Sequence, residues 1–106
     1  MAQPNVVQIL ESQQFDSKRY VSRLLHDSEK SRVVLFCLEP GQVLPPHEST
    51  SEVVFYCVEG KSIILIGEEE VVLGPKALVV CPPLVSHGIK AAGRSTVLAI
   101  ITPRPS

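Results

Sequence analysis

Short runs of β-branched and aliphatic residues alternate along the chain with clusters of Gly, Pro, Ser, Asp and Glu. Apolar runs of this kind, each bounded by turn-forming residues, are typical of β-strands. Residues 3–14 alone show a weak helical pattern. A succession of short strands favours an all-β barrel or a two-sheet sandwich over a fold of alternating strands and helices. The predicted strands are Arg19–Leu25, Val33–Leu38, Val53–Val58, Ser62–Ile66, Val71–Leu73, Ala77–Cys81 and Thr96–Ile101.

Turn-forming residues mark the connections between these strands. Gly67-Glu68 is typical of a hairpin turn. Glu39-Pro40-Gly41 and Pro45-Pro46 interrupt the middle of the chain, where proline and glycine predict loops. The proline-rich end, residues 103–106, predicts a frayed tail.

The length and the charge of the chain exclude several classes of protein. Its 106 residues suffice for one domain with its own core. A net charge of −1 leaves no basic excess to neutralise phosphates, and an aromatic content of 5% offers few rings for base stacking. No apolar run approaches the ~20 residues that a membrane span needs. We therefore expect neither a nucleic-acid partner nor a membrane partner.

The cysteines and the N-terminus bear on the compartment. Cys37, Cys57 and Cys81 are odd in number and lie inside apolar runs, which predicts buried free thiols in a reducing environment. The N-terminal residues lack the basic stretch and the long apolar stretch of a signal peptide. These two features predict a cytoplasmic protein.

One stretch of the chain has the glycine and histidine spacing of a known motif. Gly41 is followed by five residues and His47, and the stretch ends at Gly60. This spacing resembles the first motif of the cupin superfamily. In that motif a second histidine and a glutamate lie in between, and their positions are occupied here by Ser49 and Val53.

The second cupin motif is matched at Pro82 and His87. Lys76, Leu84 and Ala91 occupy the positions of its two glycines and its asparagine. The interval between the two motifs is also similar to that of small bacterial cupins. The resemblance implies a double-stranded β-helix, or jelly-roll barrel, with a pocket at its centre. The corresponding division of the chain is an N-terminal segment with an added strand at 1–31, a cupin-like barrel at 32–102 and a tail at 103–106.

The resemblance also implies where a metal would bind. In metal-dependent cupins, three histidines and one glutamate hold the ion, and this chain keeps two of those positions, His47 and His87. Two imidazoles leave a weak, open site, because durable zinc or iron sites have at least three protein ligands. His47 and His87 therefore either hold a divalent transition metal (Zn, Ni, Fe or Mn) weakly or line a metal-free pocket.

Glu52 is the obvious candidate for a third metal ligand. Side chains alternate between the two faces of a strand, so Glu52 and Tyr56 point outward if Val53, Phe55 and Cys57 point into the barrel. We expect this outward phase for Glu52. A β-bulge before it would re-aim its carboxylate into the pocket.

The pocket walls are predicted from the same alternation. Ser49, Val53 and Phe55 are expected on the wall, with Cys57 deeper along the strand. Ser49 would either hydrogen-bond a ligand or belong to a Ser/Thr turn, and Cys57 would either join a soft metal or pack in the core. No catalytic residue can be named, because adjacent Ser86 and His87 would point to opposite faces of a strand.

The favoured interpretation is a small barrel that binds a small molecule in its central pocket, with a weakly held divalent metal. One alternative is a metal-dependent enzyme of the isomerase or dioxygenase type, and another is an interaction domain with a vestigial pocket. We also expect a homodimer, because the N-terminal third carries apolar residues beyond those the barrel needs. These residues are Val6, Val7, Ile9, Leu10, Tyr20, Val21, Leu24 and Leu25.

Overall fold

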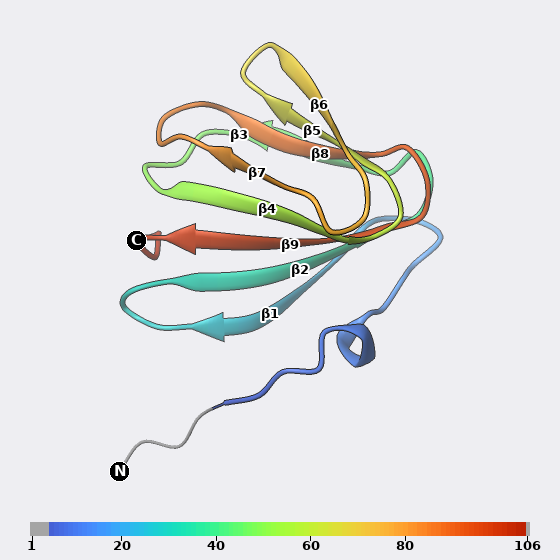
Figure 1. The fold of residues 1–106 in the computed structure, drawn as a ribbon, viewed down its shortest axis with the longest axis horizontal. Coiled ribbons are helices and arrows are strands. Elements are labelled where there is room, and N and C mark those ends of the chain that lie inside the picture. The colour runs from blue at the N-terminus through green and yellow to red at the C-terminus, as the bar shows by residue number, and fades with distance from the viewer. Residues whose placement is uncertain (1–4, 106) are drawn as a thin grey trace.

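Two antiparallel sheets face each other in the structure, which is a computed structural model describing residues 5–105. Five strands form one sheet in the order β1-β2-β9-β4-β7, and four form the other in the order β3-β8-β5-β6 (Figure 1). This arrangement confirms the all-β, double-stranded β-helix prediction. The elements are the 3-10 helix η1 (Leu10–Ser12), β1 (Val21–Asp27), β2 (Arg32–Leu38), β3 (Val43–His47), β4 (Glu52–Glu59), β5 (Ser62–Ile66), β6 (Glu69–Leu73), β7 (Leu78–Cys81), β8 (His87–Ala91) and β9 (Ser95–Thr102).

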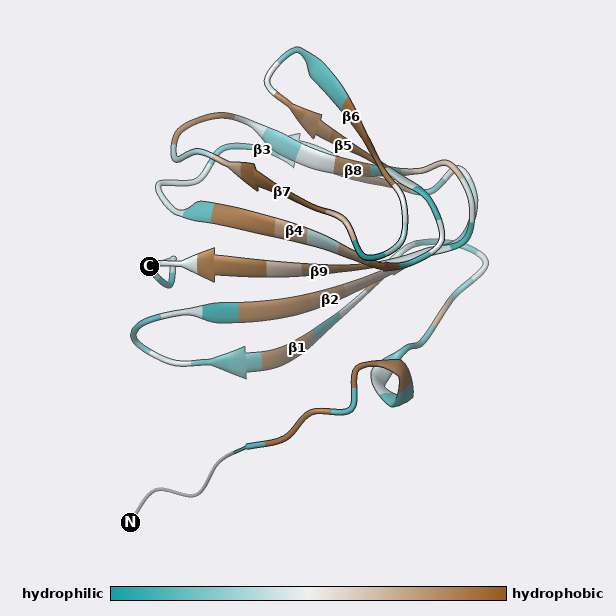
Figure 2. Cartoon of the chain, in the orientation of Figure 1, coloured by the Kyte–Doolittle hydropathy of each residue, from teal (hydrophilic) through white to brown (hydrophobic). Residues whose placement is uncertain are grey.

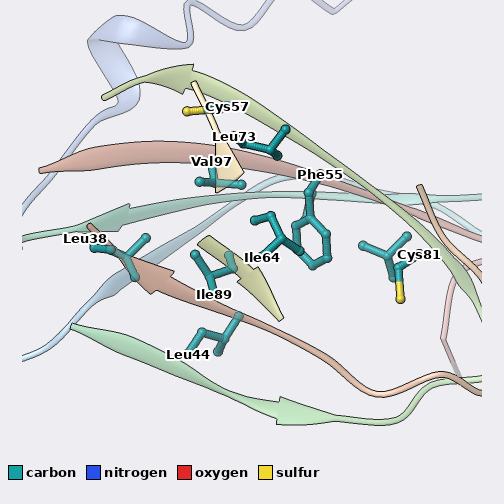
Figure 3. Packing of buried hydrophobic residues seen from close by; sticks show 12 residues of the cluster. Leu38, Leu44, Phe55, Cys57, Ile64, Leu73, Cys81, Ile89 and Val97 are labelled. Carbon is teal, nitrogen blue, oxygen red and sulfur yellow. The ribbon is translucent and has the colours of Figure 1, made fainter. Parts of the chain in front are cut away.

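The space between the sheets is filled by the inward-facing side chains of both. On β4, the residues Val53, Phe55 and Cys57 are buried, whereas Glu52 is exposed and Tyr56 is half-buried. The predicted phase of this strand is therefore confirmed. Figure 3 shows side chains from both sheets, among them Phe55 and Ile64, directed toward one another in this core. The burial of such apolar side chains is the main force that holds the two sheets together.

The opposite face of the five-stranded sheet is apolar as well, and the N-terminal segment lies across part of it. On β2, the residues Leu35 and Cys37 are fully buried, although they lie on the face opposite to the inward-facing Leu38. Cys37 pairs with Thr96 of β9, and the Thr96 hydroxyl donates a hydrogen bond to the side-chain oxygen of Gln13. Figure 2 shows that β2, β9, β4 and β7 are hydrophobic along most of their lengths. The N-terminal segment thus acts as a partial second layer over this outer face.

Two strands, β3 and β8, were not predicted, because Pro45-Pro46 and Gly88 are typical of loops. β3 is an edge strand, where the missing N–H of proline removes few ladder bonds. The register shifts between Leu44 and His47, as a β-bulge does. A side chain on Gly88 would place its Cβ 2.6 Å from the Leu44 carbonyl oxygen, so only glycine permits this close approach.

The two termini also differ from the sequence-based expectation. The helix expected over residues 3–14 is reduced to η1, and residues 1–4 lie outside the described part of the chain. The tail does not fray at Pro103 and Arg104. The Pro103 carbonyl accepts a 2.6 Å hydrogen bond from the Ser51 hydroxyl, and the Arg104 guanidinium pairs with Asp27. The same guanidinium lowers the pKa of Asp27 to about 2.

The hairpin predicted at Gly67-Glu68 is confirmed, since Ile66 and Glu69 pair directly across it. Gly67 has a positive φ of 59°, a conformation that glycine adopts without steric cost. Within residues 5–105, no helix has the length and apolar character required to cross a membrane.

Candidate functional site

His47 and His87 meet at one end of the barrel. His47 is the last residue of β3, His87 is the first residue of β8, and the two are partners in the ladder between these strands. Their ring centroids lie 4.5 Å apart with an angle of 60° between the ring planes. The bulge at Pro45-Pro46 sets this pairing, because it shifts His47 by one residue relative to the register at Leu44.

The two imidazoles have different surroundings. His47 is exposed, whereas His87 has a relative exposure of only 4%. The ring of Phe55 lies against His87 at a centroid distance of 5.6 Å. Nδ1 of His87 lies 3.4 Å from the carbonyl oxygen of Val85. Burial lowers the pKa of His87 because the charged imidazolium loses its hydration, and the nearby His47 lowers it further.

A cavity of about 60 Å³ lies beside the two rings. Apart from the imidazoles, its lining is apolar, so it offers a ligand few polar contacts. This volume has room for only a few water molecules. It suits one functional group of a ligand whose remainder lies at the mouth. The lining residues are Phe36, Leu44, His47, Val53, Phe55, His87, Ala99 and Ile101.

Val53 and Phe55 line this cavity, whereas Ser49 and Cys57 lie elsewhere. The Ser49 hydroxyl accepts a 3.1 Å hydrogen bond from the N–H of Ser51, as in a Ser/Thr turn. The thiol of Cys57 is fully buried and lies 3.4 Å from the carbonyl oxygen of Glu59, toward the other end of β4. Burial raises the pKa of this thiol, as is typical of a cysteine packed in a core.

The donor set at the cavity does not fit a resident metal ion. Within residues 5–105, no three His, Cys, Asp or Glu side chains are grouped closely enough to hold one. Glu52, the candidate third ligand, is exposed, and Val53 takes the inward position beside it. A dication at His47 and His87 would therefore meet two neutral donors and no compensating carboxylate.

The walls of the cavity were only partly foreseen. Phe36 of β2 and the pair Ala99 and Ile101 of β9 face inward, which the period-two pattern of those strands could have indicated. Leu44 lies on the unpredicted β3. The position of the Val85 carbonyl beside His87 has no local sequence signal, because it depends on the conformation of the loop between β7 and β8.

Two turns support the alignment of the second motif. Lys76 and Leu84, at its two glycine positions, have positive φ angles of 67° and 69°. These are the two non-glycine residues with positive φ in the described part of the chain. The N–H of Leu84 donates a 2.8 Å hydrogen bond to the carbonyl of Ser49, which ties the second motif to the first near the histidines.

A larger hollow of about 210 Å³ lies near the N-terminal segment, but Arg94, one of its two charged lining residues, is already engaged. The Arg94 guanidinium lies 3.7 Å from the ring centroid of Phe15 and 3.3 Å from a carboxylate oxygen of Glu39. The smaller cavity at His47 and His87 is the better candidate site, because its two imidazoles are free of such partners among the described residues.

Comparisons with known proteins agree with the fold. Residues 34–102 match the family model of the cupin domain. The structure is similar to TT1209 from Thermus thermophilus, with a TM-score of 0.88, 26% identity and coverage of 94% of this chain and 98% of that one. An RmlC-like cupin from Desulfovibrio desulfuricans is 31% identical, with a TM-score of 0.82 and coverage of 97% of each chain.

A more distant likeness concerns the fold alone. The polyketide cyclase RemF from Streptomyces resistomycificus shares 18% identity and a TM-score of 0.77, over 97% of this chain and 82% of that one. Among curated proteins, none matches the chain significantly.

Proposed function

Because this chain belongs to the family of cupin domains, we propose that it binds a small molecule in the cavity beside His47 and His87. The observation that carries the proposal is the pair of imidazoles, 4.5 Å apart, in an otherwise apolar cavity. Ligand sites are commonly apolar hollows with a few polar groups that orient the ligand. The imidazoles would provide orientation, and Val53 and Phe55 would provide apolar contact.

The proposal includes a divalent metal only as a weakly bound ion. Zn, Ni, Fe or Mn would bind weakly to His47 and His87, with water or ligand oxygens as the remaining donors. The binding would need both imidazoles in their neutral form. Since no carboxylate lines the cavity, such an ion would exchange rather than remain through purification.

The alternative of a metal-dependent enzyme has less support. RemF is called a cyclase, so a structural neighbour has an enzymatic name. An enzyme needs a general acid or base in contact with its substrate, and the cavity offers only the two histidines for this role. A metal-dependent enzyme of the isomerase or dioxygenase type would also need a firmly held metal. The third alternative is an interaction domain whose cavity has no ligand.

Two measurements on the same sample test the proposal. The first is the metal content of protein that was purified without chelator, and the second is an NMR screen of small polar and apolar fragments. We expect much less than one equivalent of metal, and fragment-induced shifts at Val53, Phe55 and Ala99. A full equivalent of metal would favour the enzyme. A complete absence of shifts at the cavity would favour the interaction domain.

We also propose a homodimer that forms through the outer face of the five-stranded sheet. Leu78 and Val80 on this face are 58% and 47% exposed, and Val6 and Leu10 of the N-terminal segment are 75% and 56% exposed. A hollow of about 430 Å³ lies on the same side and would receive apolar side chains from a second copy. Its lining comprises Leu10, Tyr56, Val58, Glu59, Gly60, Pro75 and Lys76.

Light scattering with matched variants tests the dimer. We expect the protein to be dimeric at micromolar concentration and Leu78→Asp to be monomeric. Val72→Asp is the control, since Val72 is 59% exposed on the other sheet. A monomeric parent protein, or equal effects of the two variants, would reject the outer face as the interface.

A cytoplasmic location completes the proposal. Cys37, Cys57 and Cys81 are free and buried, which suits a reducing compartment. Fractionation of cells that express the full chain would test it, with recovery outside the cytoplasm as the contrary result.

A further inference from the structure

The contact between His87 and Val85 sets the chemistry that the cavity offers to a ligand. A carbonyl oxygen only accepts hydrogen bonds, so the 3.4 Å contact favours the tautomer of neutral His87 in which Nδ1 carries the proton. The other ring nitrogen, Nε2, then carries a lone pair. No protein donor reaches Nε2 among the described residues.

The lining restricts which ligands can use this acceptor. Six of the eight lining residues are apolar, and none is an acid or a lysine or arginine. A carboxylate has no proton to donate to Nε2, and it would lose hydration against the apolar walls. A purely apolar ligand would cover this acceptor without giving it a partner, which costs free energy. A neutral hydroxyl avoids both penalties.

We infer that the ligand carries a hydroxyl group on a small apolar body, and that this hydroxyl donates a hydrogen bond to Nε2 of His87. The inference rests on the proposed function, since it specifies the ligand of the same cavity. The volume of about 60 Å³ suits the hydroxyl end of such a molecule. The apolar body would extend out of the cavity on the side of His47, which is its exposed lining residue.

Three matched probes test the inference: phenol, toluene and benzoate. Each is titrated into the protein with EDTA present, so that no metal competes for Nε2, and binding is followed by NMR shifts at Val53, Phe55 and Ala99. One net hydrogen bond should make phenol bind about fivefold more tightly than toluene. Benzoate should bind most weakly of the three.

Two variants test whether the preference for phenol over toluene depends on the imidazole of His87. His87→Phe keeps an aromatic ring beside Phe55 but removes the acceptor, so the advantage of phenol over toluene should disappear. His26→Phe is the matched control, because His26 is an exposed residue of β1 outside the cavity. It should keep the fivefold preference. Loss of the preference in both variants would overturn the assignment to His87.

A measurement on the unsubstituted protein keeps the test valid if His87→Phe does not fold. The 15N shifts of the His87 ring should show a protonated Nδ1 and an unprotonated Nε2, and phenol should perturb Nε2. A proton on Nε2 would overturn the inference. Equal binding of phenol and toluene, or tighter binding of benzoate, would also overturn it while leaving a ligand cavity in place. An absence of binding by all three probes would instead count against the proposed function.

Discussion

At the mouth of the barrel, Ser49 and Val53 stand where the cupin motif has a histidine and a glutamate, and at two turns Lys76 and Leu84 stand where it has glycines. The two regions respond differently to these departures. The turns keep the backbone of the motif, with positive φ at both residues. The histidine site does not keep the metal-binding chemistry of the motif, because no third metal ligand joins His47 and His87 among residues 5–105.

The difference shows how a backbone conformation and a ligand set depend on side chains. A left-handed residue costs about 1–2 kcal/mol when it is not glycine, and the packing of a whole domain can offset that cost. A missing metal ligand has no such compensation, since the donor atom itself is absent. The fold therefore tolerates changes in its motif that the metal site does not.

Of the substitutions considered, one at Gly60 should destabilise the fold most. Its φ is +81°, and a Cβ there would lie 2.0 Å from the Arg94 carbonyl oxygen. Gly60→Ala should therefore lower the free energy of unfolding by at least about 3 kcal/mol, since the clash is with backbone. Gly41→Ala is the control, with φ +84° and no atom within 4 Å. It should cost only about 1–2 kcal/mol in urea denaturation. Equal losses would show that conformation alone, and not the clash, makes Gly60 necessary.

Metal binding at His47 and His87 can be tested by restoring the missing carboxylate. Val53 is buried and lines the cavity with both histidines, so Val53→Glu would complete a site of two histidines and one carboxylate. Affinity for Zn or Ni should rise about a hundredfold, or about 2.7 kcal/mol, by calorimetric titration. Val54→Glu, on the other face of β4, should show no gain.

Adding Ser49→His should contribute less than Val53→Glu, because the Ser49 side chain is engaged in a turn outside the cavity. Tight binding by the unsubstituted protein would contradict the weak-site interpretation. An absence of gain with Val53→Glu would mean that the three side chains do not converge.

Features that depend on local interactions were predicted from the sequence, whereas features that depend on contacts distant in sequence were not. The alternation on β4 is local, so the inward phase of Val53 and Phe55 was predicted correctly. β3 was missed because the tolerance of Pro45-Pro46 depends on an edge position and on Gly88 across the ladder. The meeting of His47 and His87 was implied by the family resemblance alone. The hydrogen-bond partner of His87 depends on a loop conformation that has no local pattern.

The pH dependence of stability distinguishes the buried histidine from the exposed one. The folded-state pKa of His87 is below its ordinary value of 6.5, so the unfolded chain binds more protons in the interval between the two. Stability should be complete above about pH 6.5 and should decrease as the pH falls through this interval. Asp27 does not interfere, because its pKa of about 2 places its contribution between that value and 3.8.

Urea denaturation at pH 7 and pH 5 measures this effect. His87→Phe should lose less stability than the parent between these two values, because the titrating group is gone. His26→Phe should behave as the parent does. A parent protein whose stability is the same at both values would show that His87 is not shielded from water.

The smallest effect concerns the turns. Lys76→Gly and Leu84→Gly remove the left-handed cost of about 1–2 kcal/mol, but glycine adds about 0.4–1 kcal/mol of unfolded-state entropy. Both side chains are exposed, so little burial is lost. Each substitution should therefore stabilise the protein by about 0.5 kcal/mol, measured as a higher midpoint of urea denaturation. Lys61→Gly is the control, because Lys61 is an exposed lysine without a positive φ, and it should destabilise slightly. If Lys76→Gly also destabilises, the turn does not carry the strain that its φ implies. The left-handed backbone at this position would then cost no more free energy than an ordinary loop conformation.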